Sequence, residues 1–241
     1  MSFIRKHLFA YVTIVAAVLF STLFCASLYH SAVMVDSTAG ALRTTVVIDA
    51  GHGGEDGGAR SPDGVRESTI NLEIALRLDE LLHLLGGSTR MTRTEDVSLH
   101  SGDAATIASR KVSDLRNRVK LVEETVGALL VSIHQNMFSE SKYAGLQVFY
   151  AETPGSQVLA ESVQALAGTA LDKTNHRAAK PAESIYLLSE ISCTGILVEC
   201  GFLSNQEECG KLQLPEYQKQ IALVIADGIQ DYLRKANTNE I

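Results

Sequence analysis

Residues 46–59 read VVIDAGHGGEDGGA, a short apolar run that ends in an acid and leads into a histidine among glycines. With the two threonines before it, the run forms a β-branched segment over 44–49 that predicts a buried strand. The glycines predict a loop at the carboxyl end of that strand. Ligands of open α/β sheets bind beyond such strand ends, so His52 is a candidate functional residue.

Strands and helical segments alternate along the rest of the chain. Helices are expected over 68–85, 114–124, 156–171 and 217–235, and further strands over 88–93, 128–134, 145–150, 183–188 and 194–200. The polar residues 94–110 are expected to form a loop. The alternation predicts an α/β fold, a single domain with a mostly parallel central sheet of about six strands and helices on both faces.

The first 30 residues differ in character from the rest. Residues 8–29 carry no charge, and such a helix is long enough to cross the roughly 30 Å core of a bilayer. Arg5 and Lys6 precede it, which predicts a cytoplasmic N-terminus and an extracytoplasmic remainder. A cleaved signal peptide is the alternative, although the apolar core of a signal peptide is usually only about 7–15 residues long. Small residues at 37–39 offer a cleavage site.

Composition and length suggest four parts. Residues 1–30 are expected to be a membrane anchor or signal segment, 31–43 a tether, 44–235 the main domain and 236–241 a tail. The chain holds 28 acidic and 21 basic residues, a net charge of −7. It has no basic stripe and no RNA-binding motif, so nucleic acid is not an expected partner.

The cysteines do not indicate a disulfide framework. Cys25 lies in the apolar segment, which leaves Cys193, Cys200 and Cys209, an odd number without a C-x-x-C pair. Three free thiols are expected, with a Cys200–Cys209 bridge as the alternative.

The glycine loop matches neither common phosphate-binding motif. A P-loop needs Gly-Lys-Ser/Thr after the glycines, and a dinucleotide fingerprint needs a glycine at position 56, where the chain has Asp. A metal site fits better, because two imidazoles, one carboxylate and a water make a catalytic zinc site.

Polar side chains that suit such a site stand at three strand ends and one helix start. His52 follows the first strand, His134 ends the strand over 128–134, and Glu199 lies near the end of 194–200. Glu67 stands where the first helix begins. Singly, each has a structural explanation: a core histidine, a buried ion pair, or an acid favoured by the helix dipole. Glu55 is a rival ligand, because His52-x-x-Glu55 has the spacing of zinc carboxypeptidases.

Four segments together resemble the zinc-dependent N-acetylmuramoyl-L-alanine amidases. They are VVIDAGHGGEDGGA, REST at 66–69, LLVSIHQN at 129–136 and GILVECGFLSN at 195–205. They occur in the family's order and spacing, and the similarity covers roughly 44–235. Ala50 stands where many relatives have Pro, and Thr194-Gly195 replaces a common Pro-Ala. Within the family, a short domain behind one apolar segment is most similar to the germination-specific amidases of spore-forming bacteria.

The resemblance implies a role for each candidate residue. His52, Glu67 and His134 would bind Zn²⁺, which favours Glu67 over Glu55, and Glu199 would be the catalytic carboxylate. Asn136, in a His-x-Asn pattern, would help to shape the site. The implied reaction cleaves the amide between N-acetylmuramic acid and L-alanine in peptidoglycan.

The resemblance also implies a setting and alternatives. Stem-peptide removal would prepare muramic lactam in spore cortex, and some sporulation amidases need an accessory lipoprotein to hold zinc. A zinc carboxypeptidase acting on peptidoglycan peptides is the alternative enzyme. A catalytically inactive wall-binding module is the alternative from another class, although the complete set of ligands and base argues against it.

Overall fold

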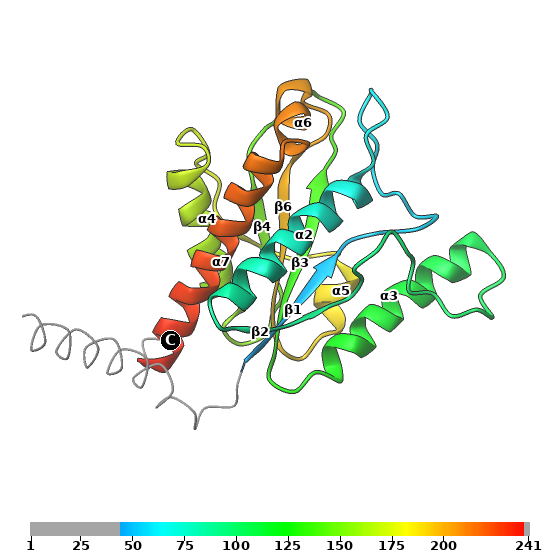
Figure 1. Cartoon of the computed structure of the whole chain (residues 1–241), viewed down its shortest axis with the longest axis horizontal. Helices are drawn as coiled ribbons and strands as arrows, with labels where there is room; N and C mark the ends of the chain where they lie inside the picture. The colour runs from blue at the N-terminus through cyan, green and yellow to red at the C-terminus, as the bar shows by residue number, and fades with distance from the viewer. Residues whose placement is uncertain (1–43, 239–241) are drawn as a thin grey trace, which may run out of the picture. The chain divides into compact units, whose positions relative to one another are not determined.

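The computed structural model describes residues 44–238 (Figure 1). The predicted anchor over 1–30, the tether over 31–43 and the end of the predicted tail lie outside these residues. No helix of the described part is both long and apolar enough to cross a membrane.

The described part is an α/β domain with one six-stranded sheet. The strands lie in the order β2 (Ser88–Met91), β1 (Thr45–Ala50), β3 (Ala128–Asn136), β6 (Thr194–Phe202), β4 (Gln147–Tyr150) and β5 (Lys180–Pro181). The first four are mutually parallel, whereas β4 runs antiparallel to β6 and β5 runs parallel to β4. The sheet is therefore mixed, and the expectation of a mostly parallel sheet was wrong.

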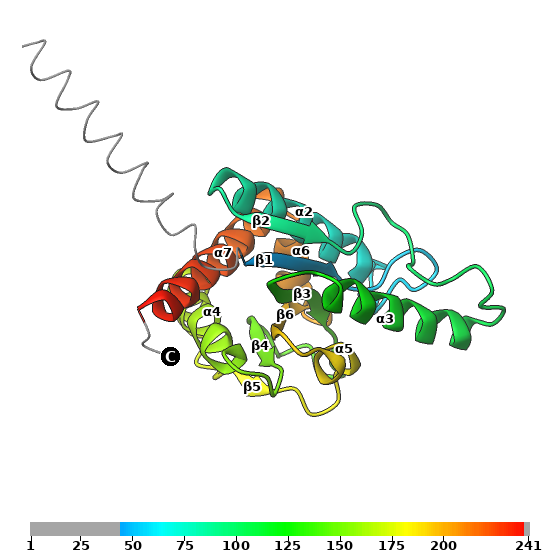
Figure 2. The same cartoon turned by 90° about the horizontal axis from the view of Figure 1, so that it is seen from below.

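Helices cover both faces of the sheet, as expected (Figure 2). One face carries α2 (Glu67–Leu84), α4 (Ser156–Ala170) and α7 (Pro215–Asn237), and the other carries α3 (Ile107–Glu123) and α5 (Tyr186–Glu190). A sixth, short helix of the described part, α6 (Gln206–Leu212), follows β6. The central strands are apolar on both faces because each face is covered.

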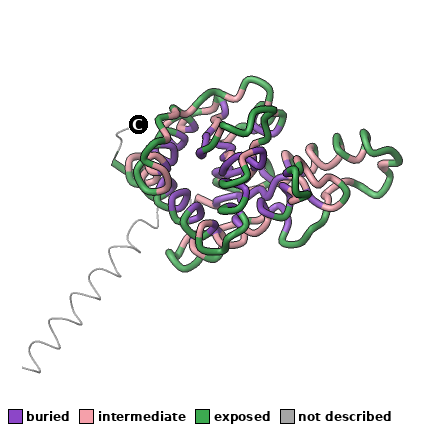
Figure 3. Tube along the Cα trace, turned by 90° about the horizontal axis from the view of Figure 1, so that it is seen from above, coloured by how far each residue is buried: buried purple, intermediate pink, exposed green. Residues whose placement is uncertain are grey.

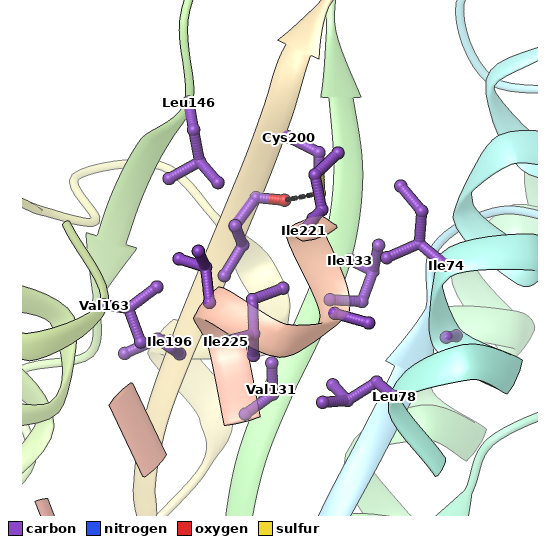
Figure 4. Packing of buried hydrophobic residues seen from close by; sticks show 14 of the residues in the cluster. Ile74, Leu78, Val131, Ile133, Leu146, Val163, Ile196, Cys200, Ile221 and Ile225 are labelled. Atoms are coloured by element: carbon purple, nitrogen blue, oxygen red, sulfur yellow. Dashed lines mark hydrogen bonds between the residues drawn. The ribbon is translucent and has the colours of Figure 1, made fainter. Parts of the chain in front are cut away.

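The larger core lies between the sheet and α2, α4 and α7 (Figure 4). Ile74 and Leu78 of α2 are fully buried there, four residues apart on one helix face. Ile221 and Ile225 of α7 repeat this spacing and are also fully buried. The purple segments of Figure 3 gather in this region, whereas the outer end of α3 is green and exposed.

Two predictions of secondary structure were wrong. Residues 183–188 were expected to form a strand, but α5 begins at Tyr186, and Leu187 and Leu188 pack on the sheet face. β6 already pairs with β3 on one side and with β4 on the other, so residues 183–188 cannot pair with it as a further strand. The loop over 94–110 ends early, because Thr106 and Ser109 form a capping box that starts α3.

The three cysteines of the described part are free thiols, as predicted. Cys200 and Cys209 are buried, and Cys193 is half-buried.

The contact between α4 and α7 depends on Gly228. A Cβ at this position would lie 2.4 Å from Val163 Cγ2 and 2.9 Å from its Cα. We expect Gly228→Ala to lower the free energy of unfolding by about 1–3 kcal/mol through overpacking, measured by urea denaturation. Gly210→Ala on α6 is the control, because that Cβ meets nothing within 4 Å. Equal stability of the two variants would contradict the packing argument.

Candidate metal centre and active site

The carboxyl ends of β1, β3 and β6 bring the predicted site residues to one edge of the sheet. His52 follows β1, and His134 lies near the end of β3 directly beside Glu199 of β6 in the strand register. Glu67 is the first residue of α2, the helix that follows the glycine loop. Parallel strands place their carboxyl ends together, so residues far apart in the sequence meet here.

His52, Glu67 and His134 form a group that could hold a metal ion. One donor atom from each residue lies within 4.8 Å of the others. Glu67 bridges the two imidazoles, with Oε2 3.3 Å from His52 Nε2 and Oε1 2.9 Å from His134 Nδ1. Two imidazole nitrogens and one carboxylate are a donor set that zinc prefers in catalytic sites. The donor chemistry thus fits the predicted metal.

Glu67 is held in place as an ionised carboxylate. It is buried and accepts hydrogen bonds from the backbone N–H groups of Ala59 at 2.8 Å and Gln135 at 3.1 Å. Burial alone would raise its pKa, but the hydrogen bonds with His134 and His52 hold the pKa well below its usual range. An ionised carboxylate is the form that binds a metal.

Asp56 orients His52, a role that the sequence analysis missed. Its Oδ2 lies 2.9 Å from His52 Nδ1. Burial lowers the pKa of His52, but Asp56 and Glu67 together raise it to about 9. A carboxylate on the second ring nitrogen is the usual support of a metal-binding histidine, because it fixes the ring and leaves the other nitrogen for the metal. An acid four residues after a candidate histidine was the available signal.

Glu55 lies apart from this group. Its carboxylate is 3.4 Å from His100 Nδ1 and 3.8 Å from Arg110 Nη1, and its side chain is 38% exposed. The group of described residues that could hold a metal ion does not include it.

Glu199 has a different environment from Glu67. Its Oε2 is buried and has no hydrogen-bond partner within the described part of the chain. Burial raises the pKa of Glu199 to about 7, with a further contribution from the charge of Glu67 that the two histidines oppose. A carboxyl group whose pKa lies near neutral pH, beside residues that could hold a metal, is suited to general acid–base catalysis.

Asn136 lies two residues beyond His134 at the end of β3. Its carbonyl accepts a 2.8 Å hydrogen bond from Leu203 N, which joins the ends of β3 and β6. None of the described residues hydrogen-bonds to its side chain in this structure, so its predicted site-shaping role stays a prediction.

Glycines give the site residues room to approach each other. A Cβ at Gly51 would lie 2.3 Å from the ring of His134, and a Cβ at Gly58 would lie 2.5 Å from Glu67 Oε2. Gly58 also has a φ of +66°, which favours glycine. The absence of a side chain at Gly51 and Gly58 thus leaves space for the side chains of His134 and Glu67.

Two buried arginines fix the backbone that carries His52. Arg118 of α3 donates to the carbonyls of Ala50 at 2.9 Å and His52 at 2.8 Å. Arg93 donates to the carbonyls of Ala50 at 2.8 Å and Gly51 at 3.1 Å. His52 has a φ of +62°, which is uncommon for a residue other than glycine. These hydrogen bonds stabilise the unusual turn.

The charge of Arg118 is matched by a buried acid. Its Nη1 lies 2.6 Å from Asp49 Oδ1, and both side chains are at most 2% exposed. Burial raises the pKa of Asp49, but Arg118 and Ser132 more than offset this and lower it to about 2.

We expect Arg118→Met to destabilise the fold strongly. The substitution leaves the charge of Asp49 buried without its partner, which costs about 3–5 kcal/mol. Urea denaturation measures the loss. Arg116→Met on the exposed side of the same helix is the control and should change stability by less than about 0.5 kcal/mol. A similar small change in both variants would show that the buried pair contributes nothing.

Comparison with known proteins agrees with this arrangement. The family model described as N-acetylmuramoyl-L-alanine amidase matches residues 46–231. The chain is 36% identical over 188 residues to the germination-specific N-acetylmuramoyl-L-alanine amidase of Bacillus subtilis, with 78% of each chain covered.

Solved structures give the same result. The CwlD amidase of Clostridioides difficile, determined in complex with the GerS lipoprotein, is 41% identical with a TM-score of 0.77, covering 79% of this chain and 98% of that one. The catalytic domain of CwlV, an N-acetylmuramoyl-L-alanine amidase from Bacillus (Paenibacillus) polymyxa, is 29% identical with a TM-score of 0.68, covering 79% and 98%.

Proposed function

The chain belongs to the N-acetylmuramoyl-L-alanine amidase family, and we propose on this basis that it is a zinc-dependent peptidoglycan hydrolase. Its substrate is the amide that joins the lactyl group of N-acetylmuramic acid to the L-alanine of the stem peptide. The observation that supports this most strongly is the convergence of His52, Glu67 and His134 beside Glu199.

The residues divide into ligands and a base. His52, Glu67 and His134 would hold the zinc ion, which when bound polarises the carbonyl and lowers the pKa of water. Asp56 keeps the ring of His52 oriented. Glu199 accepts a proton from the attacking water and delivers it to the departing nitrogen. The carbon–nitrogen bond breaks, and the products are a lactyl carboxylate and a peptide with a free L-alanine amino group.

Metal removal tests this proposal. The full-length protein, purified in detergent, is incubated with peptidoglycan after dialysis against a chelator and again after zinc is restored. The expected result is release of stem peptides only with zinc. Undiminished release by protein from which zinc analysis detects no metal would contradict it.

We further propose a role in spore cortex, because two relatives are a germination-specific amidase and CwlD. Removal of the stem peptide would expose muramic acid for conversion to the lactam by a later deacetylation. Muramic lactam content of cortex from a strain that lacks the gene tests this role. The expected result is cortex without lactam, and a normal lactam content would contradict it.

The relative solved with the GerS lipoprotein also supports an accessory lipoprotein for this chain. Such a partner would increase zinc affinity, and zinc titration with and without the lipoprotein tests this. An unchanged affinity would count against the partner.

We also propose that residues 1–30 anchor the enzyme outside the cytoplasmic membrane. The expected result is full-length protein in the carbonate-washed membrane fraction, degraded when protease is added to protoplasts. Protection from protease would contradict the orientation, and release of a shortened protein would indicate a cleaved signal.

A further inference from the structure

A cavity of about 250 Å³ opens beside the two imidazoles on the α3 and α5 face of the sheet. His52 and His134 stand at one side of it, and Leu197 of β6 contributes to its wall from the sheet. Leu115 of α3 and Ile185, next to α5, supply apolar side chains, and Tyr186 adds an aromatic ring. The cavity thus connects the metal-binding group to a slot between two helices.

The acids that line this cavity already have partners within the protein. Asp49 and Asp114 each lie 2.6 Å from a nitrogen of Arg118. Asp56 lies 2.9 Å from His52 Nδ1. Among the cations that line the cavity, Lys111 is therefore the one that pairs most weakly with an acid of the protein.

Lys111 has only a weak internal partner. Its Nζ is 3.8 Å from Asp56 Oδ2, the same oxygen that bonds His52, and its side chain is 59% exposed. An ammonium in this position is free to bind a second carboxylate. An anionic group on the substrate would therefore complement the positive charge of Lys111.

We propose that this cavity binds the first residues of the stem peptide and that Lys111 pairs with the α-carboxylate of the second residue. This proposal rests on the proposed function. The first residues of the stem peptide are the part of the substrate on the nitrogen side of the scissile amide. The small apolar wall suits the methyl group of L-alanine. The sheet and two helices enclose the slot, whereas a glycan strand that continues past muramic acid in both directions needs an open surface.

Distances agree with this placement. Two extended residues span about 7 Å. Asp56 Oδ2 lies 2.9 Å from His52 Nδ1 and 3.8 Å from Lys111 Nζ, so the ammonium lies no more than about 7 Å from that ring nitrogen. A carboxylate two residues from the scissile amide would therefore reach Lys111.

The test compares two probes that differ in one charge. They are N-acetylmuramoyl-L-alanyl-D-isoglutamate and its amide, N-acetylmuramoyl-L-alanyl-D-isoglutamine. The zinc-loaded full-length protein should have a KM for the acid about three- to tenfold below that for the amide, as expected for a partly exposed ion pair. Lys111→Met should remove this difference by raising the KM for the acid.

A matched control and a second variant complete the test. Lys120→Met removes an exposed lysine of the same helix that pairs with Glu124 at 3.7 Å, and it should keep the preference for the acid. Ile185→Trp fills the slot and should raise the KM for both probes while zinc content stays unchanged. A preference for the acid that persists in Lys111→Met would overturn the inference, and so would an unchanged KM in Ile185→Trp.

Binding of the free dipeptides separates this inference from the proposed function. Calorimetry should show that the wild-type protein binds L-alanyl-D-isoglutamate more tightly than the amide and that Lys111→Met abolishes the difference. If this holds while the wild-type protein cleaves neither probe, the proposed amide hydrolysis is wrong and the peptide subsite stands. Equal binding of both dipeptides by the wild-type protein would overturn the subsite.

Discussion

Glu199→Gln is expected to abolish most of the amidase activity while zinc binding stays intact. The substitution keeps the size of the side chain but removes its ability to accept a proton. Positioned general acid–base groups contribute about 10²–10⁴-fold to rate, so kcat should fall by that factor. Glu199 lies beside His134 in the strand register, outside the group of three proposed ligands. Zinc content, measured by mass spectrometry of the metal, should equal that of the wild-type protein.

The control for this variant is Glu124→Gln, which changes an exposed carboxylate at the C-cap of α3. It should leave both rate and zinc content unchanged. Normal turnover by Glu199→Gln would remove the residue from the mechanism. Loss of zinc in Glu199→Gln would instead make the residue a ligand.

The second large effect is expected at Glu67. Glu67→Ala removes the carboxylate that bridges the two imidazoles at 3.3 Å and 2.9 Å. Loss of a residue that only supports a ligand costs about 10–100-fold in metal affinity, so loss of a ligand should cost more than about 100-fold. Competition with a chromophoric chelator measures the change, and circular dichroism verifies that the variant is folded.

Glu55→Ala is the matched control for Glu67→Ala. Glu55 forms ion pairs with His100 and Arg110, away from the three proposed ligands. Its removal should therefore leave zinc affinity unchanged. Zinc loss in Glu55→Ala with retention in Glu67→Ala would favour the carboxypeptidase alternative.

The direction of β4 shows where sequence patterns stopped being informative about the fold. The segment over 145–150 reads as a strand, and β4 indeed lies there. Its direction depends on the connection from β3, which runs from 137 to 146 and contains no helix. A parallel crossover needs a dozen or more residues, usually with a helix. This short connection favours an antiparallel strand, and β4 pairs with β6 in that sense.

The site residues were more predictable than their supports. His52 follows an apolar strand, and His134 and Glu199 lie near the ends of two others, a pattern that predicts a shared edge of the sheet. The role of Arg118 could not be predicted, because its partner Asp49 is 69 residues away and depends on how α3 packs. Asp56 lies close in sequence to His52, but only the turn after β1 brings its carboxylate to the imidazole.

The most direct test of the central claim is the identity of the product released from peptidoglycan. Mass spectrometry of the soluble products, after incubation with the zinc-loaded full-length protein, distinguishes the candidate reactions. The expected products are whole stem peptides with a free L-alanine amino terminus, and Glu199→Gln should not release them. Release of single amino acids from the carboxyl end of the peptides would contradict the account and indicate a carboxypeptidase. Absence of any product would indicate a binding module.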